Sequence, residues 1–169
     1  MHKFIIFLLV TINAYGDDFK SDALELLKPV KKAFMGELKA GLQSGPYEAI
    51  DSCHLKAPHL VEHDKSDKYE VGRTALKVRN KENAPKTWMK EILNDYKSST
   101  AKSPKAAKVY QVKNKKVYVE PIYIKPLCLN CHGKKRGSVF KKLSKLYPDD
   151  EAFGYDVGDF RGLFYVKEK

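Results

Sequence analysis

Apolar positions recur at steps of three and four residues in the first part of the chain, which is the period of an α-helix. The pattern predicts an amphipathic helix from Phe19 to about Ser44, ended by Gly45-Pro46. A second helix is predicted from Tyr47 to about His63, with an interruption or a kink at Pro58. The apolar side of this second helix carries Cys53.

From Tyr69 onward, alternating apolar and polar positions predict strands. The first would run from Tyr69 to Arg79 and place Arg73 and Arg79 on one face. A helix opened by Asn83-Ala84-Pro85 and ending near Tyr96 is predicted next. The other predicted elements are a hairpin of Val109–Val112 and Val117–Ile124 over Lys113–Lys116, a helix over Ser138–Tyr147, and a last strand over Leu163–Val166. This order predicts an α+β fold with an antiparallel sheet flanked by helices.

Residues 1–16 have the pattern of a secretory signal peptide. Lys3 gives a positive start, residues 4–10 form an apolar run too short to span a bilayer, and Ala14-Tyr15-Gly16 supplies small residues for cleavage. The alternative is a buried N-terminal strand. We therefore expect a soluble periplasmic or otherwise extracytoplasmic protein, in which residues 17–169 form one domain.

The chain is strongly basic, with a formal net charge of +11, and 28 of its 32 basic residues are lysines. Such a surface can simply aid solubility, or it can steer an acidic redox partner protein or an anionic membrane surface. Nucleic acid is a poor partner for an exported protein, and no recognition motif for it appears.

The motif that organises the chain is Cys128-Leu129-Asn130-Cys131-His132, followed by Gly133. A C-x-x-C-H run is typical of covalent attachment of a c-type haem. Two thiols three residues apart lie on one side of a tight turn, where each can form a thioether with a haem vinyl group. His132 then lies under the iron as its proximal ligand, and Gly133 lets the backbone turn away without a side-chain clash. The motif predicts one covalent haem c.

Three other readings of the two cysteines remain. A dithiol redox pair would use the same spacing but gains nothing from the adjacent histidine. A structural zinc site commonly needs two such pairs, and the chain has only one. A plain disulfide would close a very small loop.

Two further features bear on this site. Cys53 is left over once Cys128 and Cys131 hold the haem, and a spare thiol in an oxidising compartment needs an explanation. Arg73 and Arg79 are two of only four arginines, and a planar fork suits a carboxylate such as a haem propionate. A solvated strand edge is the alternative for both arginines.

The block Gly72-Arg73-Thr74-Ala75-Leu76-Lys77-Val78-Arg79-Asn80, together with Asn83, Pro85 and Trp88, resembles a family of single-haem c-type domains with a PAS-like fold. The C-x-x-C-H-G turn and the glycines at 154, 158 and 162 match as well. Members are called haem domains of unknown function, which stand alone or serve as extracytoplasmic sensors. The resemblance implies that His132 and Cys53 both bind the iron. His54, directly after Cys53, is the alternative distal ligand.

Two classes of function follow. The first is a redox-responsive or ligand-responsive sensor, or a small electron carrier, without catalysis of its own. Its partner would be a small diatomic ligand or an acidic redox protein. The second is a peroxidase-like or thiol-modifying haem enzyme, which would need an open iron position and a proton-handling group. A spare cysteine suited to the sixth iron position favours the first.

Overall fold

The computed structural model of the chain describes residues 18–56 and 66–169. The predicted signal peptide and the predicted helix beyond Lys56, including Pro58, lie outside these residues. The described elements are α1 (Asp18–Gln43), α2 (Pro46–Lys56), β1 (Tyr69–Thr74), η1 (Lys81–Asn83), α4 (Thr87–Tyr96), β2 (Lys108–Val112), β3 (Lys115–Tyr123), η2 (Pro126–Cys128), α5 (Leu129–His132), α6 (Gly137–Leu146) and β4 (Phe160–Glu168).

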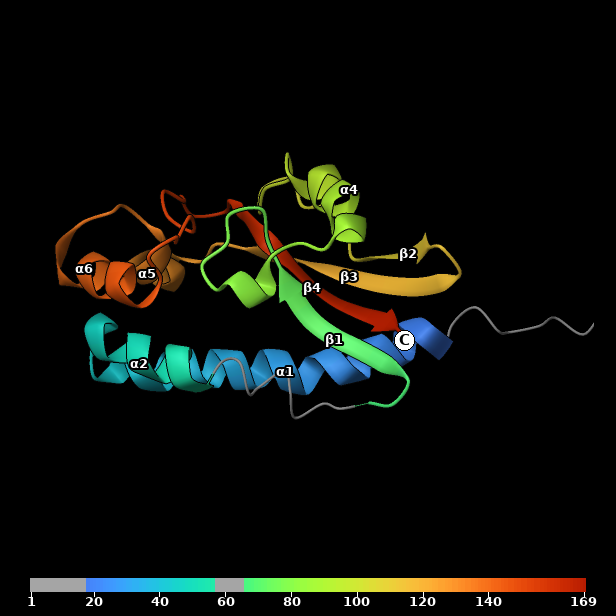
Figure 1. The fold of residues 1–169 in the computed structure, drawn as a ribbon, viewed down its shortest axis with the longest axis horizontal. Coiled ribbons are helices and arrows are strands. Elements are labelled where there is room, and N and C mark those ends of the chain that lie inside the picture. Colours follow the sequence, from blue (N-terminus) through green and yellow to red (C-terminus); the bar gives the residue numbers. More distant parts are fainter. Residues whose placement is uncertain (1–17, 57–65) are drawn as a thin grey trace, which may run out of the picture.

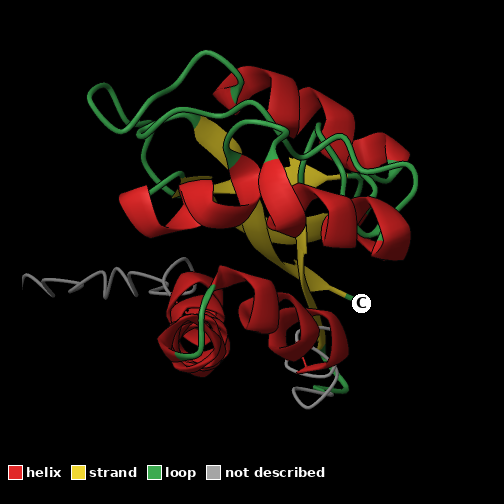
Figure 2. Ribbon diagram, turned by 90° about the vertical axis from the view of Figure 1, so that its left-hand side faces the viewer, coloured by secondary structure: helices red, strands yellow, loops and turns green. Residues whose placement is uncertain are grey.

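The four described strands form one antiparallel sheet in the order β1-β4-β3-β2. The last strand therefore lies between the first strand and the β2–β3 hairpin. The α+β class and the antiparallel sheet agree with the sequence prediction. The two layers of helices lie on opposite sides of the sheet, α4 on one and α1 on the other (Figures 1 and 2).

Alternation along β3 and β4 divides the apolar side chains between the two faces of the sheet. Val117, Val119, Leu163 and Tyr165 pack with the buried face of α4. Tyr118 and Val166 point to the other face, where α1 covers them with Phe19, Ala23, Leu27 and Val30. The apolar side chains of one face of α1 and of one face of the sheet thus form a single buried layer.

The other helices gather at one end of the sheet (Figure 1). α2 contacts α5 and α6, and a small apolar cluster of Ile50, Leu143 and Phe153 joins them. A second cluster, Ile124, Ala152 and Tyr155, packs against Cys128 and Leu129. The C-x-x-C-H turn, residues 128–132, therefore lies beyond the sheet and close to α2.

The first strand is shorter than predicted, because β1 ends at Thr74 and not at Arg79. Arg73 and Arg79 consequently do not share a strand face. Beyond Thr74 the chain makes hydrogen bonds to the segment at 150–153: Glu151 N–H donates to Val78 O at 2.9 Å, and the side-chain Nζ of Lys77 donates to Phe153 O at 3.1 Å. Residues 75–79 therefore contact a loop and do not continue the strand.

Smaller differences concern element ends. Asn80 caps η1 by accepting a hydrogen bond from Glu82 N–H, and α4 begins only at Thr87. β4 runs from Phe160 to Glu168, longer than Leu163–Val166, because it pairs on both sides. Within the described residues, no helix is long and apolar enough to cross a membrane.

Gly162 on β4 sits where a side chain would collide with β1. A Cβ there would clash with the carbonyl oxygen of Thr74 and lie 2.9 Å from Cβ of Ala75. We expect Gly162→Ala to lower the free energy of unfolding by about 1–3 kcal/mol. Gly36→Ala is the control, because nothing lies within 4 Å of a Cβ at this exposed position of α1. It should raise stability by about 0.5–1 kcal/mol. Urea denaturation of both variants measures the difference, and equal midpoints would contradict the close approach of the two strands.

Candidate functional site

The C-x-x-C-H turn is a short helical segment. Pro126 opens η2, whose last residue is Cys128, and α5 carries the chain on to His132. Gly133 is buried, and a Cβ at this position would lie 2.7 Å from the carbonyl oxygen of Leu129. A side chain at position 133 would therefore clash with the backbone of the turn itself, so the turn requires glycine there.

His132 is held in a fixed orientation. Its Nδ1 lies 2.8 Å from the carbonyl oxygen of Ala152, so that Nδ1 carries the proton and Nε2 is the nitrogen with a free lone pair. The ring of Tyr155 meets the imidazole edge-on, with centroids 6.2 Å apart. Gly154 N–H donates to the carbonyl of Gly133, and Tyr155 N–H donates to the carbonyl of His132. These two hydrogen bonds attach the segment at 150–155 to the turn.

The environment of His132 keeps the imidazole neutral. Burial lowers its pKa well below the usual value, and the positive charges of Arg161 and Arg79 lower it further. A neutral imidazole with one nitrogen engaged by a backbone carbonyl is the form in which histidine binds a metal ion.

Arg79 and Asp150 form a buried ion pair behind the turn. Nε of Arg79 lies 2.7 Å from Oδ2 of Asp150, whose carboxylate is almost fully buried. Nη2 of Arg79 donates to the carbonyls of Cys131 at 2.6 Å and Ala152 at 3.4 Å. Oδ1 of Asp150 accepts from Ala152 N–H at 2.8 Å. The same residue pair thus holds the turn and the carbonyl that orients His132.

Three of the four arginines, Arg73, Arg79 and Arg161, are near enough for their positive charge to lower the pKa of His132. The Arg73 guanidinium lies 4.4 Å from the ring centre of Phe34, and burial lowers its pKa to about 10. No described aspartate or glutamate forms an ion pair with Arg73 or Arg161. The site therefore carries positive charge that an anionic ligand can neutralise.

α2 brings Cys53 to this end of the molecule. The Cys53 thiol is half-buried, and burial raises its pKa, while Arg73 and Arg79 act to lower it. Cys53 also acts electrostatically on Cys131. The structure thus brings together Cys53, the two arginines and the C-x-x-C-H turn, which the sequence placed in three separate segments.

His54 points to a different neighbour. Its Nδ1 lies 2.6 Å from the hydroxyl of Tyr147, which follows α6, and the two rings meet edge-on at 5.2 Å. Tyr147 in turn interacts electrostatically with Cys53, Arg73 and Arg79. His54 and Cys53 therefore face the same region, but His54 is already engaged by a hydrogen bond.

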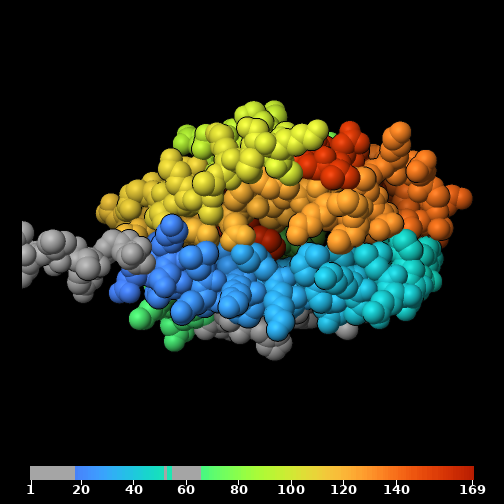
Figure 3. Space-filling view, turned by 180° about the vertical axis from the view of Figure 1, so that it is seen from behind, coloured from blue at the N-terminus to red at the C-terminus, as the bar shows by residue number. Residues whose placement is uncertain are grey.

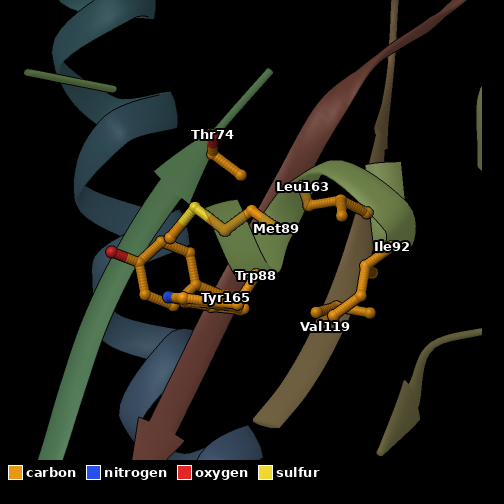
Figure 4. Close-up of a pocket in the computed structure, with 7 residues that line it drawn as sticks. All are labelled: Thr74, Trp88, Met89, Ile92, Val119, Leu163 and Tyr165. Atoms are coloured by element: carbon orange, nitrogen blue, oxygen red, sulfur yellow. The ribbon is translucent and has the colours of Figure 1, made fainter. Parts of the chain in front are cut away.

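The rest of the described structure offers no comparable site. In the described ranges, no group of three or more His, Cys, Asp or Glu side chains is arranged to hold a metal ion. The recess between α4 and the sheet has almost wholly apolar walls and no room for a water molecule (Figure 4). Its lining is Thr74, Trp88, Met89, Ile92, Val119, Leu163 and Tyr165.

Sequence reasoning missed three side chains at the site. Arg161 had a usable signal, since arginine is rare in this lysine-rich chain. Asp150 and Tyr147 had none, because their roles come from the folding of distant segments onto the turn.

Comparison with known proteins agrees with the resemblance noted in the sequence. The family model described as Tll0287-like matches residues 13–168. The chain belongs to the Tll0287-like family. The crystal structure of the cyanobacterial haem protein Tll0287 is similar in fold, with a TM-score of 0.66 and 24% sequence identity over 89% of this chain and 94% of that chain. A search of curated protein sequences found no match.

The ion pair behind the turn yields a prediction with a neighbouring control. We expect Asp150→Asn to cost about 3–5 kcal/mol of stability, because it leaves the Arg79 charge buried without its partner. Asp149→Asn removes a carboxylate from the exposed pair with Lys81 and should leave the melting temperature unchanged. Thermal unfolding followed by circular dichroism measures both. Equal melting temperatures for the two variants would show that the buried pair does not hold the turn.

Proposed function

We propose that this protein is an exported, single-haem c-type protein that acts in redox or small-ligand sensing, or in electron transfer. In this proposal Cys128 and Cys131 form the two thioethers, and His132 is the proximal iron ligand. The observation that carries it is the oriented, neutral His132 inside a C-x-x-C-H turn. When bound, haem supplies a one-electron ferric–ferrous couple.

The chemistry of the surroundings fits such a group. Apolar side chains of α2, α6 and the segment at 150–155 pack next to the two cysteines of the turn. Three arginines supply positive charge beside these apolar surfaces. A haem has an apolar ring and two carboxylates, so it needs both kinds of neighbour. We propose that Arg73 and Arg161 bind the propionates.

Arg79 has a different role in this proposal. The sequence suggested that it contacts a propionate or a neighbouring carboxylate, and it contacts the carboxylate of Asp150. Two of its donors are also engaged by backbone carbonyls. It therefore acts on the proximal ligand through Ala152 O and leaves propionate binding mainly to the other two arginines.

We propose Cys53 as the distal ligand, through its sulfur. Its position on α2 near the arginines and Cys131 supports this. Burial raises the pKa of the free Cys53 thiol, whereas the positive charges of Arg73 and Arg79 favour the thiolate, which is the form that binds iron. An anionic sulfur ligand stabilises ferric iron, so we expect a reduction potential below that of a His/Met cytochrome.

The fold and the location complete the proposal. The sheet with its first strand paired to its last, and helices on both faces, supports a PAS-like domain. The signal-peptide pattern at residues 1–16 supports export to the periplasm or another extracytoplasmic compartment.

A haem enzyme is the second candidate function. The 2.6 Å contact between His54 and Tyr147 favours it, because this pair is a proton-handling group near the proposed distal side. Such an enzyme also needs an open iron position. High-spin ferric spectra and fast cyanide binding would support it, whereas a low-spin six-coordinate spectrum supports the sensor or carrier.

Covalent attachment is tested on the denatured protein. Cells competent in c-type haem attachment should yield a band that stains for haem peroxidase activity after denaturing electrophoresis. Cys128→Ala with Cys131→Ala should remove the stain, because no thioether can form. Cys53→Ala should keep it, and a wild-type band without stain would refute the proposed cofactor.

The distal ligand is tested by two single substitutions. Cys53→Ser should change the ferric visible spectrum and raise the reduction potential, because it removes an anionic sulfur ligand. His54→Ala should leave both nearly unchanged, since His54 is engaged with Tyr147. If only His54→Ala changes the spectrum, then the ligand is His54 and the thiolate proposal is wrong.

A further inference from the structure

The positive charge of this protein is concentrated in one stretch of the chain. Residues 97–147 contain 14 lysines and arginines and one acidic residue, Glu120. The rest of the chain from residue 17 onward contains 17 basic and 20 acidic residues. The stretch that surrounds the C-x-x-C-H turn therefore carries more than the whole net charge of the exported protein.

The fold gathers this stretch on one part of the surface. Seen from behind, segments of this stretch, coloured yellow to orange, lie above α1 and α2, beside segments coloured yellow-green and red (Figure 3). We call the surface formed by residues 97–147 the basic face. Eleven of its 14 basic side chains are exposed: Lys97, Lys102, Lys108, Lys113, Lys115, Lys125, Lys134, Lys135, Arg136, Lys141 and Lys145.

These exposed charges are not neutralised within the described chain. Only Lys105 and Lys142, both half-buried, form ion pairs, with Asp95 and Asp51. None of the eleven exposed residues pairs with a described aspartate or glutamate. Elsewhere, exposed lysines such as Lys81 and Lys86 have carboxylate partners. The positive potential of the basic face is therefore available to another molecule.

We propose that the basic face is the docking surface for an acidic electron-transfer protein, which reaches the haem at the C-x-x-C-H turn. This inference rests on the proposed haem function and specifies its partner. Haem held by Cys128, Cys131 and His132 would supply a one-electron couple matched to the partner's own one-electron centre. The face accelerates encounter by long-range attraction, and lysines suit a short-lived complex because they remain hydrated and mobile.

The composition of the face favours a protein over a membrane. Peripheral membrane binding usually combines basic residues with inserted aromatic or large apolar side chains. Val109, at 36% exposure, is the one large apolar side chain counted as exposed among residues 97–147. A lysine-rich surface with few exposed apolar side chains instead fits an acidic patch on a soluble partner.

The surface is mapped by titrating the ¹⁵N-labelled holoprotein with a plant-type [2Fe–2S] ferredoxin, an acidic electron-transfer protein. Backbone amide shifts should concentrate in residues 97–147 and disappear at about 0.3 M salt. Lys134→Glu/Lys141→Glu/Lys145→Glu should weaken binding at least about tenfold at low salt. The matched control, Lys28→Glu/Lys32→Glu/Lys39→Glu on α1, has the same change in net charge and should change affinity by about twofold or less.

Four outcomes would overturn the basic face as the docking surface for a protein. Shifts on α1, equal losses in the two triple variants, or no shifts in a coloured sample would remove the basic face as the docking surface. Sedimentation with vesicles of phosphatidylcholine containing phosphatidylserine at 0.15 M salt, without ferredoxin binding, would replace the protein partner with a membrane. The visible spectrum of the same sample tests the haem separately from the docking surface. A colourless protein that still binds ferredoxin would refute the haem cofactor and leave the basic face as the docking surface.

Discussion

The buried ion pair between Arg79 and Asp150 is the interaction on which the site depends. It joins the chain after β1, the carbonyl of Cys131 and the segment that contains Ala152. Removing both charges from water is expensive, and the arrangement offsets this cost because both carboxylate oxygens and two guanidinium nitrogens have partners. The orientation of His132 is thus set by polar contacts, at an end of the molecule where the apolar clusters are small.

The packing on both faces of the sheet explains why the site lies beyond its end. The space between the sheet and α4 is filled by Trp88, Met89 and Tyr165, and the other face of the sheet is covered by α1. A large flat ligand has no room in either layer. At the end of the sheet, by contrast, α2 and α6 contribute short apolar surfaces, and the arginines contribute charge. The two packed apolar layers of the sheet are therefore separate from the end of the molecule that carries the C-x-x-C-H turn.

The helices and strands were largely predictable, because they follow local periods of apolar residues. α1, α6 and the β2–β3 hairpin agree with their predicted ranges to within about two residues at most ends. The C-x-x-C-H turn was equally visible, since its chemistry lies within six consecutive residues. The end of β1 was missed because it depends on the segment at 150–153, about 75 residues away. The roles of Asp150 and Tyr147 were missed for the same reason, as the sequence carries no sign of which distant segments meet. Arg161 could have been singled out by the rarity of arginine.

The attachment of α2 has a consequence for how the molecule opens. Among its described side chains only Ala49 and Ile50 are fully buried. Its polar links to α6 and Tyr147 come from Asp51, His54 and the carbonyl oxygen of Tyr47, which accepts from Lys142. The sheet, in contrast, is held by antiparallel ladders of backbone hydrogen bonds and by two apolar layers. Native proteins open first where buried apolar area is least. Amide hydrogens of α2 should therefore exchange with solvent long before those of β3 and β4, so that the small apolar cluster beside the C-x-x-C-H turn meets solvent before the two layers of the sheet do.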